Sequence, residues 1–373
     1  MKPIVWDPKD ESLEEFKKKH VVNEVVDRYD ELLEDLFLIR NPRFKFNKEY
    51  KTELGKFIAD YKDDKDLKGC GHWFYFPFSK ILCHYLPDNE HQEIRTARNK
   101  NLITKDEQEK LYNARVGITG MSVGSHAVLT LSLIGGGKYL ALADFDVISA
   151  SNLNRIRFDF TKIGKSKCLV VADQLYRMNP YAEIKAYDKG LSVENLDEFM
   201  NGLDVIVDAL DNLELKIRMR LKAKELGIPV IMATDNGDNI IIDVERYDLN
   251  KDTELFNGAI GHVTLKEFQN FRPQDLPKLA TKVAGANVVV PRMLASILEV
   301  GRTIYSWPQL GDAATLAGVA TAYAIKRIAL DQPVKTGKFE VNLDAVFDPE
   351  YDDKKVAEQR EAERRKYLSV IGL

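Results

Sequence analysis

Residues 115–155, RVGITGMSVGSHAVLTLSLIGGGKYLALADFDVISASNLNR, contain the most informative pattern for the fold of this chain. Two apolar runs, at 115–119 and 139–143, flank a loop of small residues and an apolar helical pattern at 124–134. The second run ends on Asp144. Strand, tight turn, helix and strand make the βαβ unit in which a backbone turn approaches phosphates at a helix N-terminus. The stretch therefore predicts a nucleotide-binding α/β fold.

The loop after the first strand departs from the dinucleotide fingerprint G-x-G-x-x-G. Gly120 is present, but Ser122 and Ser125 occupy the other two positions, and Gly124 is out of register. Taken alone, the loop fits an ordinary strand–turn–helix as well as it fits phosphate binding. The sequence that follows Asp144 is the reason to assign these four loop residues to a nucleotide site.

Strand and helix patterns continue to alternate beyond this unit. Strands are expected at 183–187, 204–208 and 229–233, and helices at 165–178, 194–201 and 213–226. This order predicts a Rossmann-like, doubly wound and mostly parallel sheet. Only the turn residues 235–238 separate the third of these strands from the next one, at 239–246, so this last pair should be antiparallel.

The residues before this core predict a mainly helical appendage at 1–94. Ser12 and Glu15 have the spacing of a capping box. Helical patterns run over residues 22–39 and 48–61. The aromatic run at 72–78 is expected to be a strand or loop packed on the main domain.

Three domains are therefore expected. Residues 1–94 form the appendage, residues 95–350 the nucleotide-binding domain, and residues 351–373 a charged helix or a solvated tail. Within the large domain, apolar patterns predict a helix at 310–330 and a final strand at 339–343.

Composition narrows the class of protein. The chain has 373 residues, 45% hydrophobic and 30% charged, as in a soluble globular protein with one large domain and an appendage. A net charge of −4 gives no indication of a nucleic-acid partner. No apolar run approaches the ~18 residues of a membrane span. The N-terminus, MKPIVWDPKDESLEEF, is too acidic and polar for a signal peptide. We therefore expect a cytoplasmic protein without a membrane partner.

The segment after the second strand resembles the ThiF/MoeB/HesA family, bacterial relatives of ubiquitin-activating enzymes. The matching residues are Asp144-Phe145-Asp146, Ser151-Asn152-Leu153, Arg155, Gly164-Lys165-Ser166-Lys167, Met178-Asn179-Pro180 and the strand that ends in Asp211-Asn212. Weaker matches extend the resemblance to about residues 95–345. The resemblance implies a homodimer that uses ATP to adenylate a carboxylate, such as the C-terminus of a small ubiquitin-like or sulfur-carrier protein or of a peptide.

The resemblance also suggests roles for individual residues around the nucleotide. Asp144, at a strand end, is placed to accept the ribose hydroxyls. Asp146 is a second candidate in the same site. Asn152 and Arg155 match residues that contact the phosphates in the family, and a guanidinium group offers paired donors in one plane to phosphate oxygens.

The remaining assignments concern charge stabilisation and the metal. Lys167 matches the family's phosphate-binding lysine, with Lys165 as its nearest competitor. Asp211 is the expected Mg²⁺ ligand, because Mg²⁺ prefers one or two carboxylates together with phosphate oxygens. Asn212 belongs to the same site and would cap the next helix. Arg98 matches an arginine that reaches into the partner subunit's ATP site in the family.

The cysteines distinguish this chain from the ubiquitin-activating relatives. Cys70, Cys83 and Cys168 form no CxxC pair, which argues against a disulfide framework and a structural zinc site. Those relatives form a thioester on a cysteine that follows the strand at 229–233, and this chain has no cysteine there. Cys168 is interpreted as a packed helix residue. The sequence therefore predicts adenylation with ATP and Mg²⁺, without zinc and without an internal thioester.

Two other classes of function remain open. A Rossmann oxidoreductase using NAD or FAD would also place an acid at about the position of Asp144. However, NAD binding requires no cluster of Arg155, Lys167 and Asp211. A nucleotide-binding interaction module without catalysis is the second alternative, favoured by the degenerate glycine loop and the large appendage. The resemblance also places a loop over the nucleotide site somewhere within residues 250–310.

Overall fold

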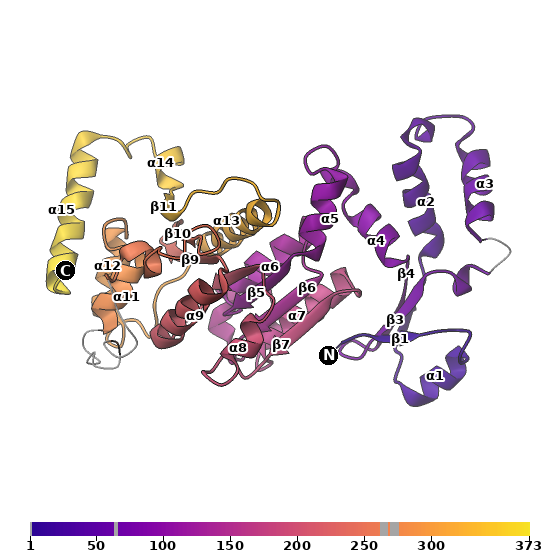
Figure 1. Ribbon diagram of the computed structural model, residues 1–373, viewed down its shortest axis with the longest axis horizontal. Coiled ribbons are helices and arrows are strands. Elements are labelled where there is room, and N and C mark those ends of the chain that lie inside the picture. The colour runs from indigo at the N-terminus through magenta and orange to yellow at the C-terminus, as the bar shows by residue number, and fades with distance from the viewer. Residues whose placement is uncertain (1, 63–65, 262–267, 269–275) are drawn as a thin grey trace. The chain divides into compact units, whose positions relative to one another are not determined.

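The structure is a computed structural model that describes residues 2–62, 66–261, 268 and 276–373 (Figure 1). The chain divides into two compact units. The first unit contains Met1–Tyr112, Ser132–Lys138 and Ala172–Glu183, and the second contains Asn113–Leu131, Tyr139–Val171 and Ile184–Leu373. Two short internal segments of the nucleotide-binding region thus belong to the first unit.

A seven-stranded sheet forms the centre of the second unit, with strand order β11-β10-β9-β8-β5-β6-β7. β5 pairs in parallel with β6 and β8, and β8 pairs in parallel with β9. β10 pairs antiparallel with both β9 and β11. The predicted parallel sheet with an antiparallel extension is confirmed. The strands are β5 Arg115–Thr119, β6 Tyr139–Ala143, β7 Glu183–Tyr187, β8 Val205–Asp208, β9 Val230–Asn236, β10 Asn239–Glu245 and β11 Gly337–Val341.

Helices cover both faces of this sheet. Successive strand residues point to opposite faces, and residues on both faces are buried against helices. Val230 and Met232 of β9 pack in one core cluster with α9. Ala233, on the other face of β9, packs with the small residues of α13. The helices between the strands are α6 Val123–Leu133, α7 Lys167–Met178, α8 Leu196–Met200 and α9 Leu213–Leu226, and α13 spans Gly311–Ala329.

The long helix α13 lies close to α6. A β-carbon at Gly318 would lie 2.3 Å from His126 Cβ and 2.7 Å from the His126 carbonyl carbon. The small residues in α13 are therefore needed for helix packing. Gly318 in particular leaves no room for a side chain.

We expect Gly318→Ala to lower the free energy of unfolding of the second unit by about 1–3 kcal/mol, the usual effect of overpacking. Gly55→Ala is the matched control: Gly55 is in α3, Tyr50–Lys62, and nothing lies within 4 Å of the added β-carbon. The control should stabilise by up to about 1 kcal/mol through helix propensity. Urea unfolding followed by circular dichroism measures both. An unchanged Gly318→Ala transition would contradict the close packing.

The C-terminal part of the second unit is mostly helical. It contains η6 Leu255–Gly258, α11 Leu276–Ala284, α12 Pro291–Glu299, α14 Asp344–Phe347 and α15 Lys354–Val370. Tyr367, Leu368 and Ile371 pack against the cluster of Val289, Met293 and Leu294. The charged C-terminus is thus a packed helix and not a solvated tail. Much of the expected loop over the nucleotide site, at 262–267 and 269–275, lies outside the described residues.

The first unit combines helices with a four-stranded sheet of order β1-β3-β4-β2. Ser12 and Glu15 form the predicted capping box, and the aromatic run forms β3. Trp73 and Tyr75 pack with Phe16 inside this unit. The strands are β1 Ile4–Trp6, β2 Glu24–Val26, β3 His72–Phe76 and β4 Ile81–Tyr85, and the helices are α1 Leu13–Lys19, α2 Tyr29–Arg40, α3, α4 Asp88–Arg95 and α5 Lys105–Asn113.

One predicted helix is wrong over part of its length. The helix expected at 22–39 begins only at Tyr29, and Glu24–Val26 form the edge strand β2. β2 pairs in parallel with β4, and the Asn23 N–H donates to the Lys80 carbonyl. Strand pairing with a distant segment overrides the local helical spacing of the valines, whose β-branched side chains suit a strand. No helix among the described residues has both the length and the hydropathy that crossing a bilayer requires.

Candidate functional site

The predicted site residues follow the carboxyl ends of neighbouring parallel strands. β6, β5, β8 and β9 are consecutive in the sheet and run in the same direction. Asp144 follows β6, Gly120 follows β5, and Asp211 follows β8. Because these strands end at the same edge, the three residues lie along one rim of the sheet. This rim is where open α/β sheets bind ligands.

The small-residue loop crosses the end of β8 at very short range. Gly120 has φ +72°, and a β-carbon there would lie 2.0 Å from the Ala209 carbonyl oxygen. Only glycine fits this position without strain. Gly124 packs against Ile118, where an added β-carbon would lie 2.8 Å from Ile118 Cγ2. The glycine that is out of register in the fingerprint is therefore required for packing of α6 on β5.

The two loop serines have different surroundings. The Ser125 hydroxyl donates to the Ser122 carbonyl at 2.7 Å. The Ser122 hydroxyl oxygen is buried and has no hydrogen-bond partner among the described residues. This orphaned hydroxyl, at the start of α6, is a polar group that a bound phosphate could satisfy.

Asp144 holds the loop to the end of β6. Its two carboxylate oxygens accept hydrogen bonds from the Met121 N–H at 2.5 Å and the Asp146 N–H at 2.7 Å. Burial raises the pKa of Asp144 above its ordinary value, although these two bonds and the charge of Lys167 oppose the shift. The carboxylate thus shapes the loop as well as lying at the predicted ribose position.

Asp146 and Lys167 form an ion pair. The Lys167 Nζ lies 2.8 Å from Asp146 Oδ2, and the Lys167 N–H donates to the Asp146 carbonyl at 3.0 Å. Only 8% of the Lys167 side chain is exposed. The lysine is therefore held at the start of α7, beside the predicted nucleotide loop. Lys165, its competitor, is exposed.

Asn152 shapes the turn that presents Arg155. It belongs to η4, Ala150–Asn154, and its Oδ1 accepts the Ser149 N–H at 3.0 Å. Arg155 Nη1 donates to the Ser151 carbonyl at 3.1 Å and to Asn154 Oδ1 at 2.9 Å. Arg155 Nε is buried without a hydrogen-bond partner among the described residues. Asn152 is buried, and its side-chain oxygen already accepts a backbone hydrogen bond. Its direct contact with a phosphate therefore stays a prediction.

Asp211 and Asn212 mark the start of α9. Asn212 Oδ1 accepts the Leu215 N–H at 3.0 Å, which confirms the predicted helix cap. Asp211 is exposed and has neither a hydrogen bond nor an ion pair within the described part of the chain. A single free carboxylate fits Mg²⁺, which takes one or two carboxylates and fills its other positions with water and phosphate oxygens.

A buried charge network lies behind Asp211. Arg220 is fully buried and bridges Asp208, at 2.5 Å, and Glu245, at 2.7 Å. Lys216 also pairs with Asp208, at 3.0 Å. Burial opposes ionisation of Asp208, but the charges of Lys216 and Arg220 outweigh it and lower the pKa of this carboxyl. The network fixes the end of β8 and the first turns of α9, between which Asp211 lies.

Two predicted residues have other positions in the structure. Arg98 is exposed in η3, Ala97–Asn99, which belongs to the first unit. Its role in a partner's site stays a prediction. Cys168 is fully buried in α7, and burial raises the pKa of its thiol to about 12. It is a packed helix residue, as expected, and not a nucleophile.

Sequence reasoning missed Asp235 and Gln309. Asp235 is a buried residue near the end of β9, where the sequence pattern indicates only a turn. It is 6% exposed, and Gln309 Nε2 donates to its Oδ2 at 3.1 Å. Asp235 comes just after the apolar residues of β9, a strand parallel to β8, and that position is the signal that could have identified it, as it did for Asp144 and Asp211.

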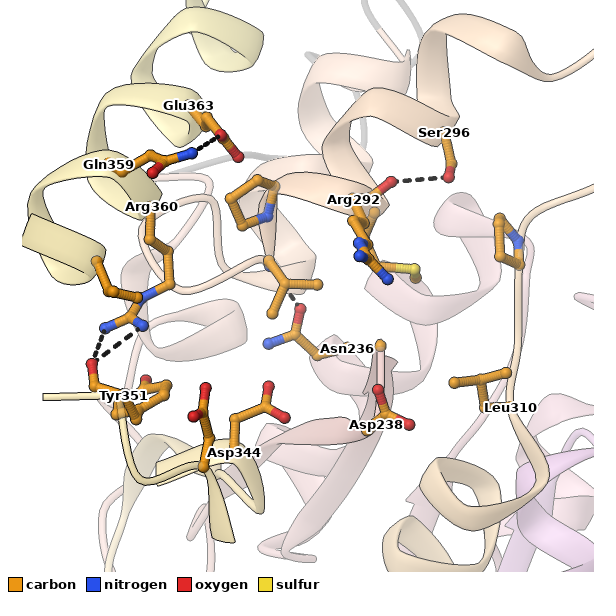
Figure 2. Close-up of a pocket in the computed structure, with 17 residues that line it drawn as sticks. Asn236, Asp238, Arg292, Ser296, Leu310, Asp344, Tyr351, Gln359, Arg360 and Glu363 are labelled. Atoms are coloured by element: carbon orange, nitrogen blue, oxygen red, sulfur yellow. Dashed lines mark hydrogen bonds between the residues drawn. The ribbon is translucent and has the colours of Figure 1, made fainter. Parts of the chain in front are cut away.

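A cavity of about 550 Å³ opens beside the tip of the β9–β10 hairpin (Figure 2). Hydrogen bonds hold the tip: Asn236 donates to the Val288 carbonyl and to Glu340 and accepts the Val290 N–H. Arg292, Asn236 and Asp238 are among the residues that line this cavity (Figure 2). The volume is in the range of small-ligand pockets. Other residues lining the cavity are Leu310, Asp344, Tyr351, Gln359, Arg360 and Glu363.

Comparison with known proteins finds one family that is similar to the central part of the chain. Residues 96–244 match the model of the ThiF family. Uncharacterized protein MT1398 of Mycobacterium tuberculosis is 32% identical over 324 residues, which cover 86% of this chain and 45% of that protein. The tRNA threonylcarbamoyladenosine dehydratase of Haemophilus influenzae is 33% identical over 40% of this chain and 59% of its own length.

A third relative has a name that specifies its reaction. Sulfur carrier protein ThiS adenylyltransferase of Escherichia coli is 33% identical over 36% of this chain and 54% of its own length. The chain spans about half the length of the curated relatives it matches.

Proposed function

We propose that this chain, whose residues 96–244 are a ThiF family domain, is an ATP-dependent adenylyltransferase that activates a carboxylate. The observation that carries the proposal is the arrangement along one rim of the sheet. A glycine turn and the carboxylates of Asp144 and Asp211 follow strands that end at this edge, and Lys167 is ion-paired with Asp146, two residues after Asp144. Several relatives are named as adenylyltransferases of sulfur-carrier or molybdopterin-synthase proteins, which supports the same reaction class.

The proposed step transfers AMP to the carboxylate. A carboxylate oxygen attacks the α-phosphorus of ATP, the bond to the bridging oxygen of the β-phosphate breaks, and pyrophosphate leaves. Catalysis of this kind rests on positioning and on stabilising the charge that develops at phosphorus. Arg155 and Lys167 would supply that positive charge, and Asp144 would hold the ribose. Asp211 would hold Mg²⁺, which neutralises phosphate charge when bound.

The proposed substrate is the C-terminus of a small ubiquitin-like or sulfur-carrier protein, or of a peptide. We propose that the acyl-adenylate is the last intermediate formed by this chain, without a thioester on Cys168. Cys168 is buried and protonated at neutral pH. The acceptor would then come from a separate molecule. We further propose a cytoplasmic homodimer in which Arg98 of one protomer completes the ATP site of the other, in keeping with the family resemblance.

Exchange of labelled pyrophosphate into ATP tests the reaction. We expect exchange only when a suitable carboxylate, such as a carrier protein with a free C-terminus, is present. Thermal shifts separate this proposal from a Rossmann oxidoreductase, because a ligand stabilises the protein that binds it. ATP with Mg²⁺ should raise the melting temperature, and NAD should not. Stabilisation by NAD with no exchange for any carboxylate would refute the proposal.

Substituting the two neighbouring lysines tests the phosphate-binding assignment. We expect Lys167→Ala to lower kcat/KM for adenylation on the order of 100-fold, the scale for removing one charge-stabilising group. Lys165→Ala is the control, because Lys165 is exposed and its bonds within the described part of the chain are backbone bonds to Ile148 and Lys162. Steady-state rates of pyrophosphate release measure both variants. Equal losses in the two would reject the assignment of Lys167.

A further inference from the structure

A continuous chain of hydrogen bonds connects Arg155 to Asp235. Arg155 Nη1 donates to Asn154 Oδ1 at 2.9 Å, and Asn154 Nδ2 donates to the Gln309 carbonyl at 2.7 Å. Gln309 Nε2 in turn donates to Asp235 Oδ2 at 3.1 Å. Three segments far apart in the sequence thus meet here: the turn after β6, the segment before α13 and the end of β9.

The backbone at Asn154 and Arg155 is closely packed, although the side-chain bonds of Asn154 are exposed. A β-carbon at Gly311, the first residue of α13, would lie 2.6 Å from the Asn154 carbonyl oxygen. The His126 Nε2 lies 2.6 Å from the Arg155 carbonyl oxygen and fixes the backbone at that residue. Arg155 is therefore held by its backbone on one side and by Asn154 on the other. Its guanidinium has limited freedom to adopt other rotamers.

Each end of the chain of bonds carries an unsatisfied polar atom. Asp235 Oδ1 and Arg155 Nε are both buried, and neither has a hydrogen-bond partner among the described residues. Asp235 is 94% buried, yet it is a carboxylate without an ion pair in the described part of the chain. Leaving a buried polar atom unsatisfied costs about 1–3 kcal/mol. Such a cost is typical of residues retained for a reason other than stability.

We propose that Asp235, acting through Gln309 and Asn154, is a positioning residue that holds the Arg155 guanidinium in place for adenylation. The inference rests on the proposed function and extends it to two residues, Asp235 and Gln309, outside the family's matching motifs. An arginine side chain loses substantial rotamer entropy when it is fixed. A guanidinium that is already fixed meets the developing charge on the α-phosphate without reorganisation.

The electrostatics of Asp235 give this role a pH signature. Burial raises the pKa of Asp235 to about 6, and the bond from Gln309 and the charge of Arg155 oppose the shift. Asp312, at the start of α13, raises it further. Above pH 6 the ionised carboxylate attracts Arg155 and accepts from Gln309. Below pH 6 the protonated carboxyl loses that attraction.

The raised pKa of Asp235 also predicts that its ionisation lowers the stability of the folded protein while it supports activity. An acid whose pKa is raised on folding binds its proton more tightly in the folded state, so stability falls as pH rises through the interval from its unfolded value to about 6. Asp235→Asn removes the ionisation. At pH 7 this variant should therefore melt at a higher temperature than the wild type while it catalyses more slowly. A merely structural role for Asp235 would not separate stability from activity in this way.

The kinetic test uses Asp235→Asn and Gln309→Ala, with Asp197→Asn on the surface of α8 as control. We expect each test variant to lower kcat for adenylation on the order of 10–100-fold, with little change in the KM for ATP. The double variant should lose no more than either single one, because both changes weaken the same connection between Asp235 and Arg155: one removes the charge and the other removes the bond from Gln309. In the wild type, kcat should rise from pH 5 to 7 with a midpoint near 6, and Asp235→Asn should abolish this rise. An unchanged kcat, or a pH profile that survives the substitution, would overturn the proposal.

A second readout is independent of turnover. In ¹⁵N NMR spectra of the free protein, the Nε–H signal of Arg155, assigned from its loss in Arg155→Lys, should be protected from solvent exchange. It should exchange rapidly in Asp235→Asn and Gln309→Ala but not in Asp197→Asn. If the Nε–H signal stayed protected from solvent in both test variants, the positioning role would be refuted, even if no carboxylate supported pyrophosphate exchange into ATP. Conversely, the test variants could lose solvent protection while the wild type shows no pyrophosphate exchange for any carboxylate. That result would refute only the proposed function.

Discussion

Replacing Asp211 by alanine is expected to lower kcat/KM for adenylation on the order of 10²–10³-fold, the scale for losing one preorganised electrostatic group. Asp211 follows β8, is exposed, and makes no ion pair or hydrogen bond within the described residues. It is thus free to hold Mg²⁺ between the protein and the phosphates. The concentration of Mg²⁺ that gives half-maximal rate should rise in the variant. Pyrophosphate release at a series of Mg²⁺ concentrations measures both effects.

Glu214→Ala is the matched control for this experiment. Glu214 is an acid in the first turn of α9, three residues after Asp211, but it pairs with Arg218 at the surface. Its removal should leave the Mg²⁺ dependence unchanged. If Asp211→Ala retained full turnover, the assignment of the metal ligand would be wrong. If the wild type lacked turnover but the variant kept a bound carrier protein, the chain would be an interaction module and not a catalyst.

The largest effect on stability is expected for Arg220→Met. The side chains of Arg220, Asp208 and Glu245 are all fully buried, and removing one partner of a buried ion pair costs about 3–5 kcal/mol. The Arg220 guanidinium also lies 3.8 Å from the centroid of the Phe256 ring, so its loss leaves a gap in packing. Urea unfolding at pH 7 should show the shift in the second unit.

Arg218→Met, on the same helix, is the control for this variant. Arg218 pairs with Glu214 where both side chains are partly exposed, and such a pair contributes about 0–1 kcal/mol. The double variant Arg220→Met/Glu245→Gln should lose less than the sum of its single variants, because the second change removes the unpaired charge. Equal stability of Arg220→Met and Arg218→Met would show that the buried network contributes nothing.

Much of the core architecture could be read from local patterns. The alternation of apolar strands and helices from Arg115 to Glu245 predicts the elements of the parallel sheet, because burial on both faces requires near-continuous apolar runs. The turn at residues 235–238 predicts the antiparallel pair β9–β10. Helix starts at Ser12 and Asn212 are equally local, since a cap bonds to an amide only three residues away.

The predictable residues of the candidate site are those that follow apolar strands and those that match the family's motifs. Asp144 and Asp211 each follow an apolar strand, and the structure places both at one rim. The resemblance favours Lys167 over Lys165, and in the structure Lys167 is the buried member, paired with Asp146. That these residues bind ATP and Mg²⁺ stays a proposal.

Local sequence is enough to predict the succession of strands and helices along the chain, the glycine turn and the acids at the strand ends, because each of these depends on residues close together in the chain. Tertiary structure alone decided the rest. The strand β2 forms only because β4 is available to pair with it. Arg220 becomes a buried bridge only when β8 and β10 bring Asp208 and Glu245 to it. The connection from Asp235 to Arg155 crosses three separate segments, and no spacing in the sequence encodes such a contact.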